Sequence, residues 1–217
     1  MSKFIAHDLA GLLLGRSANA NQELQPKWMQ VYGRLSIMAP LSFINQNDYY
    51  IDLVLRKMEG ELSIIIEEEF KNPACKLAET YMMAGIAQDT MTKMWVLSTY
   101  EIIRIARASD AGKNNDRLDE LYRLLTLVRM PLAKGEIAAE RHLPDQLVLE
   151  RVGDGYTQNS QYIKNSTKNY IPASFIRSLT GSIGWHVVQS KPLASIEITR
   201  RELSDLMLNL FEEAPVD

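Results

Sequence analysis

The stretch that decides the fold reads ACKLAETYMMAGIAQDTMTKMWVLSTYEIIRIARA and covers residues 74–108. A mainly apolar stripe recurs through it in alternating steps of four and three residues: Leu77, Tyr81, Ala84, Gln88, Met91, Trp95, Ser98, Ile102 and Ile105. Because an α-helix completes a turn in 3.6 residues, this spacing keeps the stripe on one face. The stretch therefore predicts a long helix that packs against other helices.

Two polar residues, Gln88 and Ser98, interrupt the stripe. A buried polar side chain needs a hydrogen-bond partner, and such a residue can set the register between packed helices. Alternatively, both residues face solvent where the stripe drifts away from the core. The sequence leaves these two interpretations open.

The flanking segments also have helical spacing. Pro26 suits a first helical turn, and apolar positions follow it from Trp28 to Met38. A second row recurs at every fourth position: Tyr50, Val54, Met58, Leu62, Ile66 and Phe70. Gly60 weakens this helix, which is either continuous or broken there. Asn115 or Asp116 can cap a further helix that kinks or restarts at Pro131.

The C-terminal part has a different composition. Residues 153–170 are rich in Gly, Asn, Ser, Gln, Thr and Tyr, which predicts a loop. Residues 183–188 and 195–198 predict a β-hairpin, residues 147–149 a possible third strand, and Thr199 with Glu202 a capping box before a final helix. We expect a mainly α (α+β) fold forming one globular unit: an antiparallel helical bundle at 1–143, a mostly loop linker at 144–182, and the hairpin plus helix at 183–217.

Composition excludes several classes of protein. The 217 residues carry a formal net charge of −3 and a single cysteine, Cys75, so neither a disulfide framework nor a Cys-rich zinc site is expected. Residues 3–20 resemble a signal peptide, but His7 and Asp8 interrupt the apolar run, which favours a short amphipathic helix. No apolar run approaches the roughly 18 residues of a membrane span. We expect a cytoplasmic protein.

A charged group near Pro131 is the candidate ligand site. Arg129, Lys134 and Glu136 surround the proline, while Glu101 and Arg104 lie near the end of the preceding long helix. Residues 110–115 form a short turn, so the two helices should be antiparallel neighbours. One interpretation is a pocket for a phosphate or carboxylate, held by the basic side chains. The other is a set of surface ion pairs.

Nucleic-acid binding is a separate possibility. Tyrosines and lysines are interspersed in the expected loop, at Tyr156, Tyr162, Lys164, Lys168 and Tyr170. Such residues can stack on bases and contact phosphates, although polar tyrosine-rich loops also bind proteins. Residues 198–203 resemble the openings of helices in some helix-turn-helix domains, mostly through capping residues. The acidic net charge argues against this function.

Catalytic and metal-binding signatures do not appear. His7, His142 and His186 are scattered without an HExxH pattern, and no phosphate-binding glycine loop is present. We therefore assign no catalytic residue, metal or cofactor. The expected function is a non-catalytic protein-interaction or oligomerisation module, a subunit of a larger assembly whose partner is protein, either a second copy or another chain, and not a membrane. The alternatives are an enzyme or anion binder at the charged group, and nucleic-acid binding at the tyrosine-lysine segment.

Overall fold

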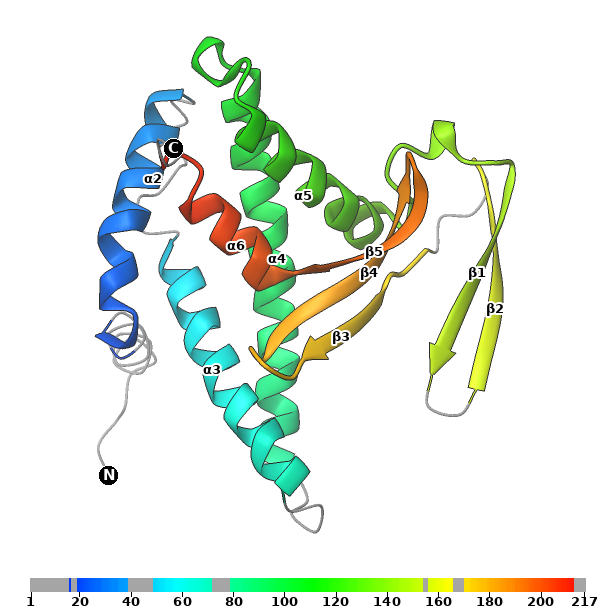
Figure 1. Cartoon of the computed structure of the whole chain (residues 1–217), viewed down its shortest axis with the longest axis horizontal. Helices are drawn as coiled ribbons and strands as arrows, with labels where there is room; N and C mark the ends of the chain where they lie inside the picture. Colours follow the sequence, from blue (N-terminus) through cyan, green and yellow to red (C-terminus); the bar gives the residue numbers. More distant parts are fainter. Residues whose placement is uncertain are drawn as a thin grey trace, which may run out of the picture.

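The computed structural model describes residues 16, 19–38, 49–71, 79–153, 156–165 and 170–212, with side chains omitted at 79–83, 150–153 and 156–158. Four long helices form the body: α2 (Gln25–Met38), α3 (Tyr49–Lys71), α4 (Glu79–Ala108) and α5 (Asp116–Lys134). Strands and the short helix α6 (Arg200–Leu208) follow (Figure 1). This confirms the mainly α (α+β) fold class. The expected amphipathic helix near the N-terminus lies outside the described residues.

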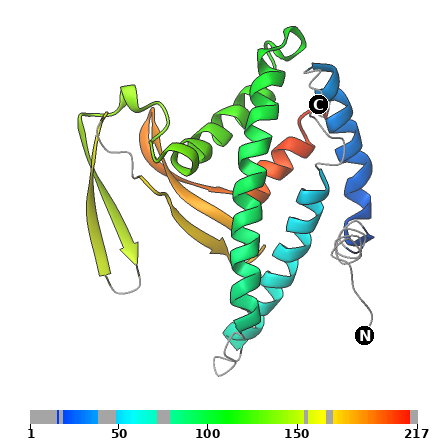
Figure 2. The ribbon, with the colours of Figure 1, turned by 180° about the vertical axis from the view of Figure 1, so that it is seen from behind.

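Helix α4 is the helix that the stripe predicts, and it spans the length of the body (Figure 2). Trp95 and Ile102 are buried in the main core, as the spacing indicates. The two polar interruptions differ: Gln88 is buried and donates a 2.9 Å hydrogen bond to the carbonyl of Gly181, whereas Ser98 is exposed. Gln88 therefore positions a turn of the sheet against α4.

Helices α4 and α5 are antiparallel neighbours, as the short turn predicts. Ser109 accepts a hydrogen bond from the Gly112 N–H, and Asn115 caps α5 by accepting one from the Leu118 N–H. A Cβ at Gly112 would lie 2.0 Å from the Ala106 carbonyl oxygen, so this turn requires glycine. Helix α5 continues past Pro131 and ends at Gly135, which has a left-handed φ of 66°. Of the two alternatives expected at Pro131, a kink or a restart, the continuous helix excludes the restart.

Helix α3 is continuous through Gly60. However, its buried face is not the row from Tyr50 to Phe70. Phe70 is exposed, while Asp52, Arg56 and Glu59 are buried. The rule that charged residues face solvent fails here because these side chains find partners from another element, described below.

The predicted C-terminal hairpin is confirmed and belongs to a three-stranded antiparallel sheet, ordered β3 (Ala173–Arg177), β4 (Ser182–Ser190) and β5 (Leu193–Thr199). Trp185 pairs with Ile198 across β4 and β5, and both are buried against the helices. Thr199 and Glu202 form the predicted capping box, which starts α6. The third strand of this sheet is β3, from the expected linker. Residues 147–149 do form a strand, as predicted, but it belongs to a separate hairpin.

The expectation of a mostly loop linker at 144–182 is wrong. Besides β3, this range contains β1 (Gln146–Gly153) and β2 (Tyr156–Ile163), which pair antiparallel as a separate hairpin. In both views the hairpin stands beyond the sheet, on the opposite side from α2 (Figures 1 and 2). A small second core anchors its base: Ile137, Leu143, Tyr162 and Tyr170. Two buried tyrosines therefore order a segment whose polar composition is typical of a loop.

Candidate functional site

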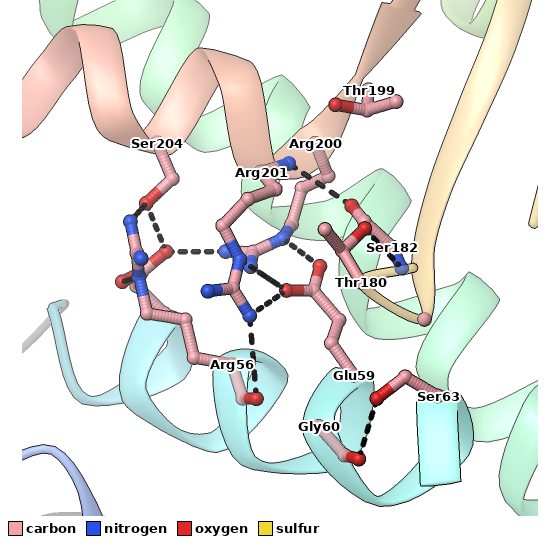
Figure 3. A network of polar contacts seen from close by, with 12 residues as sticks. Arg56, Glu59, Gly60, Ser63, Thr180, Ser182, Thr199, Arg200, Arg201 and Ser204 are labelled. Atoms are coloured by element: carbon pink, nitrogen blue, oxygen red, sulfur yellow. Dashed lines mark hydrogen bonds and ion pairs between the residues drawn. The ribbon is translucent and has the colours of Figure 1, made fainter. Parts of the chain in front are cut away.

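A dense group of charged side chains lies inside the body, between α3 and α6 (Figure 3). We call it the buried ion cluster. Helix α3 supplies Asp52, Arg56 and Glu59. Helix α6 supplies Arg200, Arg201, Ser204 and Asp205.

Local structure explains why these residues meet. Asp52, Arg56 and Glu59 are spaced by four and three residues, so they share one face of α3. The capping box fixes the start of α6 at Thr199, which places Arg200 and Arg201 in its first turn. The Arg201 N–H also donates a 3.0 Å hydrogen bond to the hydroxyl of Ser182 on β4. The end of the sheet therefore aims both arginines at α3.

Glu59 is held by two arginines. Arg200 donates through Nε to Oε1 at 2.6 Å and through Nη2 to Oε2 at 2.5 Å, which is the bidentate geometry of strong guanidinium–carboxylate pairs. Arg201 Nε donates to the same Oε2 at 2.7 Å. Arg200 also lies over the Trp95 ring of α4, at 5.5 Å from its centroid.

Asp52 has a full set of donors as well. Its Oδ2 accepts hydrogen bonds from Trp28 Nε1 on α2 at 3.0 Å and from Arg56 Nε at 2.7 Å. Its Oδ1 accepts bonds from Arg200 Nη1 and, at 2.6 Å, from the Ser204 hydroxyl. Burial alone would raise the pKa of Asp52, but the positive charges of Arg200 and Arg56 outweigh it, so this pKa lies below its ordinary value.

The charges of the buried ion cluster cancel: Asp52, Glu59 and Asp205 oppose Arg56, Arg200 and Arg201. Asp52, Glu59 and Arg200 have no solvent exposure. A reacting group needs access to substrate, and these side chains are saturated by one another. The cluster therefore ties α2, α3, α4, β4 and α6 together, and its role is structural.

The predicted anion site is only partly assembled. Arg104 donates a 2.8 Å hydrogen bond to Glu101, and Arg129 from α5 lies 3.8 Å from the other oxygen of that carboxylate. Arg129 also lies 4.9 Å from the centroid of the Tyr100 ring. Lys134 is exposed at the last position of α5, and Glu136 follows the glycine that ends the helix. The described contacts join Glu101, Arg104 and Arg129 on the surface.

The tyrosine-lysine segment is not an open aromatic surface. The rings of Tyr162 and Tyr170 are buried against each other, with centroids 6.1 Å apart, and the Tyr162 hydroxyl donates to Glu140 at 2.9 Å. Lys164 donates to the carbonyls of Arg141 and Leu143. Base stacking on these two rings would require the small core to open. Lys168 and the side chain of Tyr156 lie outside the described residues.

Other sequence candidates occupy ordinary positions. On β4, Trp185 is buried and His186 is exposed, as opposite faces of a strand require. His7 and Cys75 lie outside the described residues. Within the described ranges, no three His, Cys, Asp or Glu side chains converge to hold a metal ion. None of the described helices has both the length and the apolar character that a membrane crossing demands.

An exposed apolar surface lies where α3 ends beside the turn between β3 and β4. Phe70 is 79% exposed and Leu179 is 88% exposed. Both line a hollow of about 370 Å³ that is completed by Ser63, Ile66, Glu67, Lys71 and Ser178. We call this surface the apolar end. The sequence does not reveal this surface, because its two most exposed residues are 109 positions apart in the chain.

Comparison of the chain with protein-family models, with curated proteins and with solved structures gave no match. The geometry therefore has to carry the functional argument.

Proposed function

We propose that this chain is a non-catalytic protein-interaction module that associates with a second copy of itself through the apolar end. The observation that carries the proposal is the exposure of Phe70 and Leu179 around one hollow. Single exposed apolar residues are common, but large apolar side chains gathered around a hollow mark interaction sites. Two such residues in water leave hydrophobic stabilisation unused, which burial in an interface would recover.

The apolar end is held in place by contacts behind it. Gln88 of α4 binds the carbonyl of Gly181 in the same turn that carries Leu179. A Cβ at Gly181 would lie 1.9 Å from the carbonyl oxygen of Glu59, so this turn also contacts α3 directly. A side chain presented by a fixed turn loses little conformational freedom on binding, which favours affinity.

A second copy fits this surface because the surface is self-complementary: the exposed Leu179 projects beside a hollow. In a two-fold dimer the same patch of both copies meets, so Leu179 of one copy can enter the hollow beside Phe70 of the other. The ion pair between Glu67 and Lys71, at 2.6 Å, neutralises charge at the rim. The exposed Glu68 and the half-buried Glu69 lie outside this pair and favour a larger assembly that also supplies basic groups.

Sedimentation velocity over a series of concentrations up to high micromolar tests the proposal. We expect the native chain to sediment as a monomer–dimer equilibrium, and Leu179→Ser to weaken the dimer at least about tenfold, which corresponds to roughly 1.4 kcal/mol. Ile37→Ser removes an exposed apolar residue from α2 and serves as the control, with no effect expected. A native chain that stays monomeric at high micromolar concentration overturns the proposal, as does equal weakening by Ile37→Ser.

A further inference from the structure

A second hollow lies between the β1–β2 hairpin and the three-stranded sheet. Its volume is about 370 Å³, which is within the roughly 300–1,000 Å³ range of small-molecule pockets. One wall is strand β1, and the rest comes from the segment before β3 and from all three strands of the sheet. The lining consists of Leu147, Val148, Leu149, Tyr170, Ile171, Ala173, His186, Val188, Leu193, Ala194 and Ser195.

Large aliphatic side chains surround this hollow without filling it. Val148, Ile171 and Leu193 come from three separate segments, and they are 67%, 65% and 53% exposed. Protein interiors pack closely and leave few voids larger than a water molecule. Three exposed aliphatic residues around one hollow therefore indicate a site that an apolar molecule can occupy.

The floor of the hollow is a face of the sheet. Ala173 pairs with His186 and Val188 pairs with Ser195, so the side chains of these four residues project from one face. The opposite face carries Trp185 and is buried against the helices. In the floor, His186 is paired with both β3 and β5, and Val188 is paired with β5. A small molecule needs only the sheet face that these side chains present.

One end of the floor is polar. The His186 ring lies 4.8 Å from the Phe175 ring, and its Nδ1 lies 3.7 Å from Glu197, which in turn accepts a 2.9 Å hydrogen bond from Arg177. An imidazole can donate or accept a hydrogen bond. The Glu197–Arg177 pair beside it is neutral overall, which suits an uncharged head group better than an ion.

We infer that this hollow binds a small, elongated apolar molecule whose uncharged hydrogen-bonding head lies beside His186. The aliphatic side chains from β1, Val188 and Leu193 contact the apolar part, and the head remains at the polar end of the sheet face. This site is separate from the apolar end and does not depend on self-association.

Fluorescence of the uncharged apolar dye 1-N-phenylnaphthylamine, with displacement by 1-decanol, tests this inference on the full chain. Ser195→Phe is the decisive variant because it adds apolar surface while removing room in the hollow. If the dye binds inside the hollow, Ser195→Phe should lower its affinity at least about tenfold. If the dye adsorbs to exposed apolar surface in general, its affinity should stay the same or rise. Ser98→Phe, at an exposed position on α4, is the matched control and should bind as the native chain does.

A further variant tests the head group. His186→Leu should weaken 1-decanol severalfold while leaving dye affinity nearly unchanged, because the dye depends mainly on the apolar wall. Thermal melts and circular dichroism establish that each variant is folded. The inference is overturned if the native chain does not bind the dye at micromolar concentration, or if Ser195→Phe and Ser98→Phe behave alike. Equal binding of 1-decanol by His186→Leu overturns the placement of the head.

Discussion

Arg200 donates two parallel hydrogen bonds to the carboxylate of Glu59, and neither side chain is exposed to solvent. The two residues are 141 positions apart, so their pair closes a large part of the chain. Removing charges from water is costly, and that cost is offset only when hydrogen bonds satisfy both partners. In the buried ion cluster this condition is met, which makes the pair sensitive to loss of either member.

Replacing Arg200 should therefore destabilise the fold strongly. Arg200→Met leaves Glu59 and Asp52 buried with fewer donors, and we expect a loss of about 3–5 kcal/mol in the free energy of unfolding. Urea denaturation followed by circular dichroism measures it. Arg104→Met breaks an exposed pair with Glu101 and should cost far less. Similar losses in both variants would contradict a structural role for the cluster.

The turn before β4 should also be intolerant of substitution. Gly181 has a φ of 66°, and an added Cβ would collide with the Glu59 carbonyl. We expect Gly181→Ala to cost at least about 2 kcal/mol in unfolding free energy. Gly60→Ala is the matched control, because nothing lies within 4 Å of its Cβ position in α3. Alanine should stabilise that helix by up to about 1 kcal/mol. Chemical denaturation of both variants decides whether the effects have opposite signs.

Removal of the capping box should weaken α6 and, through it, the ion cluster. Thr199 accepts a 3.2 Å hydrogen bond from the Glu202 N–H, and Thr199→Ala should cost about 1 kcal/mol. Thr90→Ala provides a comparison, since Thr90 is exposed in the middle of α4 and bonds only its own helix backbone in the described contacts. That change should be neutral or slightly stabilising. If the melting temperatures of the two variants shift equally, a stabilising role for the Thr199 cap is contradicted.

Stability should also fall at alkaline pH through Tyr162. Burial, reinforced by the hydrogen bond to Glu140, raises the pKa of Tyr162 to about 12, although the bond from the Ile137 N–H acts in the opposite direction. Because the folded state prefers the neutral phenol, its contribution is complete below the unfolded-state pKa of about 10 and is lost as the pH rises toward 12.

Ultraviolet difference absorbance of phenolate measures this titration. We expect Tyr162→Phe to remove one phenol that ionises near pH 12 and to reduce the loss of stability between pH 10 and 12. Denatured protein, in which the tyrosines titrate together, is the reference. If the phenol that Tyr162→Phe removes ionises in the same pH range as the tyrosines of the denatured protein, the buried hydrogen bond to Glu140 is contradicted.

Helices α2, α4 and α5 could be predicted because their evidence is local. Trp28, Trp95 and Leu121 recur at helical spacing with other apolar residues and are buried as expected. The β4–β5 hairpin and the Thr199 cap are also local patterns. The β1–β2 hairpin could not be predicted in this way, because its second strand reads YTQNSQYI and lacks an apolar alternation. Its order depends on Tyr162 and Tyr170, which meet only in the folded chain.

The candidate sites show the same division. Glu101, Arg104 and Arg129 lie close together because a short turn makes α4 and α5 neighbours, and their role in binding an anion stays a prediction. The buried ion cluster was missed, since Asp52, Arg56 and Glu59 look like a solvated helix face when α3 is considered alone. A signal was present in the spacing of these charges and in the adjacent Arg200 and Arg201, but nothing in either segment names the other.

By itself, then, the sequence determined which segments coil into helices, where their caps lie, and that the last strands form a hairpin, because these properties depend on residues a few positions apart. Only the tertiary structure decided which charges are buried, and which apolar residues stay in water at the apolar end and around the hollow beneath the hairpin. Those outcomes depend on pairs such as Glu59 with Arg200 and Phe70 with Leu179. Their members are more than a hundred positions apart, so only the packing of the whole chain places them in one ion pair or around one hollow.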